Sequence, residues 1–151
     1  MMKVLIDYPS ENDELQMLMR IGEGASASDF NLTQLRTLIT PNHVLALQKL
    51  ARQVTLDEQV MRYIVNIVRV TRDWPGIMRG AGPRAGIALL SAAKAFALVQ
   101  GRNFVTPDDV KQLALPCLRH RVLLSAELEI EGANADQVLK DIVQNVNAPR
   151  Q

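Results

Sequence analysis

The 151-residue sequence has few aromatic side chains and a single cysteine. Aromatic residues make up only 4% of the chain, and the apolar residues are mainly Leu, Val, Ile, Ala and Met. A β-sheet protein of this size normally carries more Tyr, Phe and Thr, so the composition favours helices. Cys117 has no second cysteine to pair with, which excludes a disulfide framework within the chain and a cysteine-based zinc site. A reducing compartment is therefore expected.

Long apolar runs and a strong net charge are also lacking. The longest stretch without a charged residue, Thr37–Gln48, has 12 residues, whereas a membrane-spanning helix needs about 20 apolar residues. Asp7 interrupts the first apolar residues, where a signal peptide would continue them. The formal net charge is only +1, which argues against a general polyanion binder. We expect a cytoplasmic protein without a membrane span.

No nucleotide-binding or metal-binding motif is complete. A P-loop needs a glycine followed by a lysine, and none of the eight glycines is followed by one. Gly80, Gly82 and Gly86 loosely mimic a dinucleotide fingerprint, but no predicted strand precedes them. Cys117 and His120 are close in sequence but lack further ligands, so we predict no metal site, a buried cysteine and a surface histidine.

Start and stop signals for helices predict a mainly α protein, a helical bundle of five or six helices with short connections. The expected helices are 10–22, one that begins at Thr40-Pro41, 57–73, 84–99, 106–118 and about 134–146. Before them, Lys3–Tyr8 is predicted to form a lone strand, and Gly22–Asn31 is predicted to be a linker. Two short extended segments are expected at Val122–Leu124 and Leu128–Ile130.

Apolar spacing indicates which helix faces form the core. The helix over 57–73 is apolar on nearly every side, so we expect it to be central and covered by its neighbours. Small residues in the helix over 84–99 allow close approach of other helices. The inward faces of the second and last helices are predicted to consist of Val44, Leu47, Leu50 and Ala51, and of Val138, Leu139, Ile142 and Val143.

Arg84 is the one residue that breaks a local rule. It lies in the first turn of a predicted helix, where a cation opposes the helix dipole by about 0.3–1 kcal/mol. The free backbone N–H groups at such a helix end form a position for an anion, and a guanidinium can hold two phosphate oxygens at once. Arg84 is therefore either part of a phosphate clamp or the partner of a nearby carboxylate, and the residues alone favour neither reading.

Three motifs occur in order: Gly80-Ala81-Gly82-Pro83-Arg84-Ala85 before an Ala/Leu-rich helix, the segment Gly101–Val110, and Leu118–Arg121. With these motifs, the sequence from Thr40 to about Val146 resembles the C-terminal part of MoxR-family AAA+ ATPases. The resemblance implies a lid subdomain. It also implies that the Walker A, Walker B, sensor 1 and arginine-finger residues of the parent protein lie upstream of Met1. Residues 1–9 would then be the last core strand, 10–39 a connecting helix and linker, and 40–151 the helical lid.

In that family the arginine of the Gly-x-Pro-Arg turn is the sensor-2 residue, and this role carries over to Arg84. It contacts the nucleotide phosphates and couples the position of the lid to the ATP or ADP state. The resemblance also implies that Gly82 and Pro83, which complete the turn, belong to the nucleotide-binding site. The family more often has a serine where this chain has Gly82, so a capping hydroxyl is missing while the turn is still permitted.

The resemblance further implies ATP and Mg²⁺ as cofactors of the parent protein, with no tight binding and no ATP hydrolysis by this chain alone. Implied partners are the AAA+ core of the same protein, neighbouring subunits in a hexameric, chaperone-like ring, and von Willebrand factor A-type proteins. The alternative reading is a stand-alone interaction or nucleic-acid-binding module, because Val105–Val110 is also similar to the last helix of histone-fold-like proteins. Scarce aromatic residues and acids near the C-terminus argue against it, and no specific nucleic acid is expected.

Overall fold

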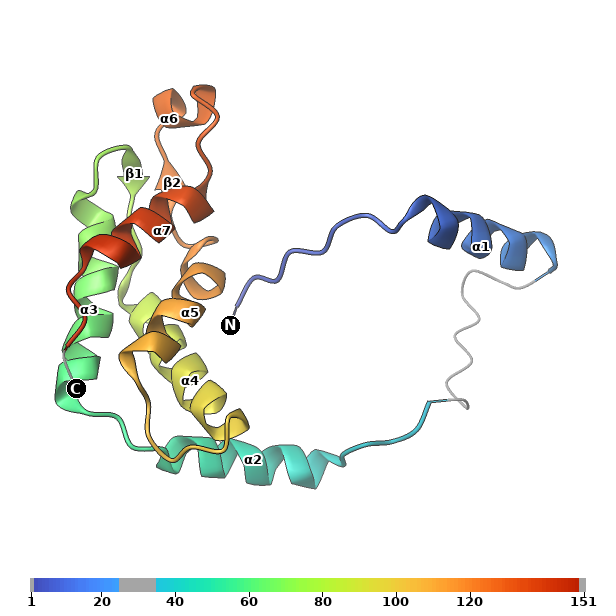
Figure 1. Cartoon of the computed structure of the whole chain (residues 1–151), viewed down its shortest axis with the longest axis horizontal. Coiled ribbons are helices and arrows are strands. Elements are labelled where there is room, and N and C mark those ends of the chain that lie inside the picture. The colour runs from blue at the N-terminus through green and yellow to red at the C-terminus, as the bar shows by residue number, and fades with distance from the viewer. Residues whose placement is uncertain (1, 25–34, 150–151) are drawn as a thin grey trace. The chain divides into compact units, whose positions relative to one another are not determined.

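The structure is a computed structural model that describes residues 2–24 and 35–149 (Figure 1). The chain divides into two compact units, one formed by Met1–Val4 with Leu45–Gln151 and the other by Leu5–Val44. The first unit contains the helical bundle and the candidate site. No helix within 2–24 and 35–149 is long and apolar enough to cross a membrane.

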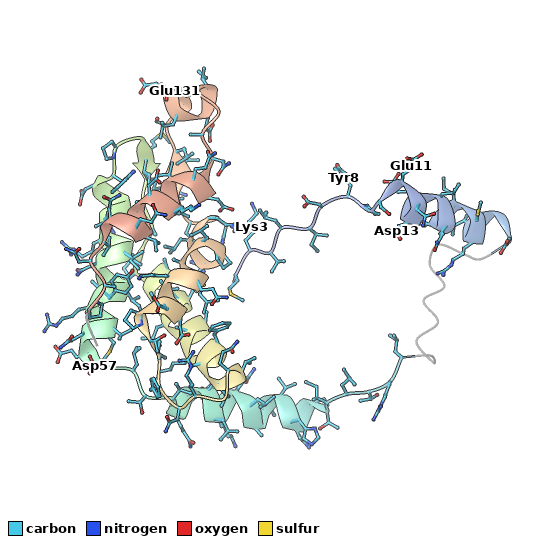
Figure 2. All side chains as sticks on the ribbon, viewed as in Figure 1. Lys3, Tyr8, Glu11, Asp13, Asp57 and Glu131 are labelled. Carbon is cyan, nitrogen blue, oxygen red and sulfur yellow. The ribbon has the colours of Figure 1, made fainter. Side chains whose placement is uncertain are left out.

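The smaller unit contains helix α1, Glu11–Gly22, and the start of helix α2, Pro41–Gln53. The predicted start of α1 is confirmed, since the Ser10 hydroxyl accepts a hydrogen bond from the Asp13 backbone N–H at 3.3 Å. Acidic residues in the first turn complement the helix dipole. α1 buries none of its residues, and Figure 2 shows the labelled Glu11 and Asp13 in its first turn.

The strand predicted at Lys3–Tyr8 is not formed in the structure. A strand requires a hydrogen-bonded neighbouring strand, and this segment has none among the described residues. The Lys3 backbone N–H donates to the Pro116 carbonyl at 2.8 Å, and the Lys3 carbonyl accepts from the Arg119 side chain at 3.4 Å. Tyr8 is exposed and projects from the ribbon (Figure 2). Pairing of this segment with a strand outside the chain stays a prediction. Most of the predicted linker at Gly22–Asn31 lies outside the described residues.

Helix α2 starts at Pro41 as predicted, with the Thr40 hydroxyl accepting a hydrogen bond from the His43 backbone N–H. The prediction that its apolar face is buried is wrong. Val44, Leu47 and Leu50 are exposed, and Ala51 is only half-buried. Apolar spacing shows which face of a helix is suited to burial, but burial also needs a neighbour, and none within the described residues covers this face.

The bundle consists of α3 (Glu58–Asp73), α4 (Pro83–Val99), α5 (Pro107–Leu118) and α7 (Ala135–Asn145). α4 packs against both α3 and α5, and α7 packs against α3 and α5 (Figure 1). α3 is central as predicted and buries Tyr63, Ile64, Ile67 and Val68. One expectation for α3 is wrong, because Met61 and Val65 are exposed and one face remains uncovered.

Small side chains allow α4 to lie close to its neighbours. Four alanines of α4 are buried together with Leu89, which confirms the predicted close approach. The predicted inward face of α7 is also confirmed, with Val138, Leu139, Ile142 and Val143 all buried.

Between α5 and α7 the structure differs from the prediction. Leu123–Leu124 forms strand β2 as expected, and it pairs antiparallel with β1, Ile77–Arg79, which was not predicted. The prediction of a second extended segment is wrong, because Leu128–Ile130 belongs to the short helix α6, Ala126–Ile130. The Ser125 hydroxyl accepts a hydrogen bond from the Leu128 backbone N–H and caps this turn.

Candidate functional site

The three residues predicted to bind nucleotide lie together at the start of α4. Gly82 is the N-cap residue, Pro83 is the first helical residue, and Arg84 follows in the first turn. Pro83 fits this position because its missing N–H would have no partner within the helix. Gly82 makes no side-chain cap, as its missing hydroxyl predicts. The first turn also contains no acidic residue, so its free N–H groups and the Arg84 guanidinium present positive charge together.

Arg84 is exposed and has no carboxylate partner among the described residues. The four ion pairs found there are Arg62–Glu58, Arg102–Asp109, Lys111–Asp108 and Arg119–Asp136. Of the two readings left open by the sequence, pairing of Arg84 with a nearby carboxylate is therefore not realised within 2–24 and 35–149. The guanidinium is free to contact a ligand from solvent.

The turn before α4 is attached directly to the last turn of α3. The Thr71 hydroxyl accepts a hydrogen bond from the Ala81 backbone N–H at 2.9 Å and donates one to the Val68 carbonyl at 2.6 Å. The carbonyl of Ala81 is bonded as well, since it accepts a hydrogen bond from Arg72 Nε at 3.0 Å. Both polar groups of the Ala81 backbone are thus bonded to α3. Thr71 was not predicted from the sequence, although a threonine at the spacing of a buried helix face needs a polar partner for its hydroxyl.

Gly80 allows this attachment because it has no side chain. A Cβ atom at this position would lie 2.5 Å from the Thr71 carbonyl oxygen and 2.6 Å from the Arg72 Cα atom. Both neighbours are backbone atoms, so neither can rotate away. At Gly82, by contrast, a Cβ atom would meet nothing within 4 Å.

An apolar groove of about 390 Å³ lies between α3 and α4, next to this turn. Its walls include the uncovered face of α3, with Met61 and Val65, and the exposed Ile87 of α4. Arg69, Arg72 and Pro83 also line the groove, so its apolar surface adjoins basic side chains near the start of α4.

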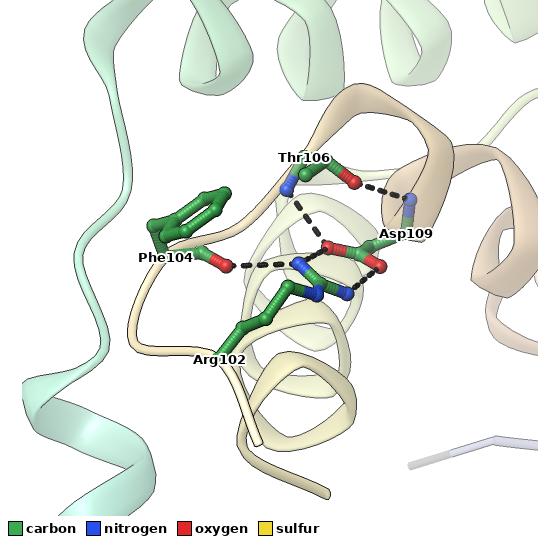
Figure 3. Close-up of polar contacts among 4 residues, drawn as sticks. All are labelled: Arg102, Phe104, Thr106 and Asp109. Atoms are coloured by element: carbon green, nitrogen blue, oxygen red, sulfur yellow. Dashed lines mark hydrogen bonds and ion pairs between the residues drawn. The ribbon is translucent and has the colours of Figure 1, made fainter. Parts of the chain in front are cut away.

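A second polar cluster fixes the start of α5 (Figure 3). Arg102 donates to both carboxylate oxygens of Asp109, at 2.8 and 2.5 Å, and to the Phe104 carbonyl at 3.0 Å. Asp109 and Thr106 form a capping box, in which each side chain accepts a hydrogen bond from the other residue's backbone N–H. Burial of Asp109 alone would raise its pKa, but the hydrogen bonds from Arg102 and Thr106 outweigh that effect and lower the pKa of this carboxyl.

The Arg102–Asp109 cluster holds the loop after α4 against the first turn of α5, so we assign it a structural role. The sequence also predicted a buried Cys117 and a surface His120, and both predictions are confirmed. Cys117 is fully buried and its burial raises the pKa of the thiol, while His120 is exposed beyond the end of α5. No group of three potential metal ligands occurs within the described part of the chain.

Comparison with known proteins gives matches over most of the chain. Residues 70–142 match the family model of the AAA lid domain. The chain is 35% identical to the Bacillus subtilis protein YeaC, over 99% of this chain and 45% of that protein. It is 27% identical to Chaperone MoxR1 of Mycobacterium tuberculosis, over 98% of this chain and 40% of the chaperone. The chain thus spans less than half the length of these relatives.

The crystal structure of a candidate ATPase from Cytophaga hutchinsonii is similar in fold, with a TM-score of 0.81 and 31% sequence identity. The similarity covers 99% of this chain and 47% of that one. The lid-domain match includes the end of α3, the turn of Gly80 to Arg84, and most of α7. Together, these matches show that residues 70–142 are an AAA lid domain, in a chain that is similar to part of a MoxR chaperone and to part of a candidate ATPase.

Proposed function

We propose that this chain senses the ATP or ADP state of a MoxR-type AAA+ ATPase through Arg84, its sensor-2 residue, within a chaperone-like ring. One observation carries the proposal: an exposed arginine, with no carboxylate partner within 2–24 and 35–149, occupies the first turn of a helix in the lid domain. This arrangement costs stability at the helix end, and a bound anion would offset that cost.

The chemistry of the turn suits a phosphate chain. The free N–H groups at the start of α4 can donate hydrogen bonds to phosphate oxygens. The Arg84 guanidinium can add two parallel, charge-assisted N–H···O bonds to the same group. ATP and ADP differ by one phosphoryl group, so a contact from Arg84 to that group would be made in one state and lost in the other. A lid that gains or loses this contact changes its preferred position relative to the nucleotide.

The remaining parts of the proposal concern the parent protein. ATP and Mg²⁺ would be bound mainly by a P-loop core outside this sequence, since no glycine here is followed by lysine. Arg84 would be presented to a nucleotide at the boundary with a neighbouring subunit, in a hexameric ring. The parent would be cytoplasmic, with von Willebrand factor A-type proteins as its partners. This chain by itself would not hydrolyse ATP.

The test is steady-state ATP turnover by the full-length parent protein carrying Arg84→Ala. We expect kcat to fall by at least about tenfold, because removal of one positioned donor to a reacting phosphate commonly costs that much or more. The fold should remain intact, since the side chain is exposed and has no partner within the described residues.

Arg62→Ala is the matched control. Arg62 is also an exposed arginine, but it lies near the first turn of α3, at the end away from Thr71, and pairs with Glu58 on the surface. Its turnover should stay within about twofold of wild type, since exposed ion pairs of this kind contribute little. Wild-type turnover of the Arg84 variant would remove the proposed role.

A further inference from the structure

We infer that Thr71 is a positioning residue that orients Arg84 towards the nucleotide. Thr71 acts by holding the Ala81 backbone, to which Arg72 makes the second contact. The inference rests on the proposed function of Arg84 and extends it to a group that touches no ligand. Thr71 is fully buried in the last turn of α3, and its hydroxyl bonds to the Ala81 backbone N–H.

The Ala81 backbone is held on both of its polar groups. Its N–H donates to Thr71 Oγ1 and its carbonyl accepts from Arg72 Nε, so it can neither rotate nor shift without losing a hydrogen bond. The Ala81 side chain is itself buried in the core. Gly80 brings the chain against the backbone of α3, with no space for a Cβ atom. These contacts together fix one point of the turn relative to α3.

Only two residues separate this fixed point from Arg84. Gly82 is extended at the N-cap, and Pro83 has a φ angle set by its ring. The Ala85 backbone N–H bonds to the Gly82 carbonyl at 2.9 Å, which closes the first turn of α4 around Arg84. The position of the Arg84 Cα atom is therefore determined by the contacts of Ala81. A displacement of about 1 Å at a reacting group can lower a rate by about 100-fold.

The Thr71 hydroxyl also has a polar role that valine cannot replace. It donates to the Val68 carbonyl and accepts from Ala81 N–H, so both its donor and one acceptor position are in use. Thr71→Val keeps the shape of the side chain but leaves a buried N–H without its partner. Thr71→Ser keeps the hydroxyl and loses only a methyl group.

The test is a double-mutant cycle on ATP turnover by the full-length parent protein, with Thr71→Val and Arg84→Ala alone and combined. If Thr71 acts through Arg84, Thr71→Val lowers kcat by about tenfold or more when Arg84 is present. It then changes kcat by less than about twofold in the Arg84→Ala background. Thr71→Ser should restore most of the turnover, and the KM for ATP should change by less than about threefold, since the P-loop would make most phosphate contacts.

An equal loss of kcat from Thr71→Val in both backgrounds would overturn the inference, because it would show a general structural effect. Wild-type kcat for Thr71→Val, with a reduced kcat for Arg84→Ala, would also overturn it but leave the proposed function standing. A wild-type kcat for Arg84→Ala would overturn both the inference about Thr71 and the proposed function of Arg84. If Thr71→Val does not fold, as judged by circular dichroism, Arg72→Met replaces it in the same cycle, because Arg72 is exposed and its Nε holds the other side of Ala81.

Discussion

At the scale of single residues, hydrogen-bonded side chains fix where the helices of the lid begin. Asp109 is the most constrained of them, since it is 4% exposed and accepts hydrogen bonds from Arg102 and from the Thr106 backbone. Its carboxylate joins the loop after α4 to the first turn of α5 (Figure 3). A change at this position should therefore affect stability and leave the Arg84 site unchanged.

We predict that Asp109→Asn lowers the melting temperature of the chain by at least about 5 °C, because the guanidinium of Arg102 loses its charged partner. The loss should depend on pH. The pKa of Asp109 is lowered in the folded state, so its charge stabilises the fold above the ordinary aspartate pKa of about 3.9. That contribution is lost as the pH falls through the lowered pKa.

Melting curves of the wild type and the Asp109→Asn variant between pH 7 and pH 2 check this prediction. The two melting temperatures should converge as the pH falls. A constant difference over that range would mean that the charge of Asp109 is not what stabilises the start of α5.

The sequence contained the signals for several of these residues but not for their partners. Thr106 before Pro107 and two acids predicts the start of α5, because a hydroxyl cap and an N1 proline act locally. Arg84 was singled out by its conflict with the helix dipole. The contacts of Arg102 and Thr71 could not be predicted, because they depend on how the loop after α4 and the turn before α4 fold back.

At the scale of elements, the α3–β1–α4 hairpin is the part that presents the candidate site. Its turn packs backbone against backbone, which makes it sensitive to the size of residue 80. Gly80 has an ordinary backbone conformation, so the reason for glycine here is space and not a positive φ angle.

Gly80→Ala should destabilise the chain by about 1–3 kcal/mol, because the new methyl group would force the turn away from α3. Gly82→Ala is the matched control, since its methyl group would meet nothing within 4 Å and its φ of −84° suits any residue. Urea denaturation of both variants measures the difference. Equal stabilities of the two variants would contradict the close packing of Gly80 against α3.

Elements with strong local signals were predicted well, and those that depend on partners were not. The bounds of α3, α4 and α5 follow from caps, an N1 proline and the Pro75-Gly76 stop. β1 has only three residues and exists because β2 pairs with it across a long stretch of sequence. Leu128–Ile130 is apolar at both ends and can form a strand or a helical turn, and the Ser125 cap decides for the helix.

At the scale of the whole molecule, the chain leaves apolar surface uncovered on several helices. The apolar residues of α1 and α2 are exposed, and so is the face of α3 that lines the groove. The sequence pattern located the apolar faces of α2 and α3, but the prediction that neighbouring helices cover them is wrong. The relatives are more than twice as long as this chain.

The central claim is that Arg84 distinguishes ATP from ADP, and the ratio of the two affinities tests it most directly. Calorimetric titration of the full-length parent protein with a non-hydrolysable ATP analogue and with ADP gives this ratio for the wild type, Arg84→Ala and Arg62→Ala. A charge-assisted hydrogen bond contributes about 1.5–3 kcal/mol, so Arg84→Ala should reduce the preference for the ATP analogue by about tenfold or more. Arg62→Ala should leave it unchanged. An Arg84→Ala protein with the wild-type ratio would contradict the account.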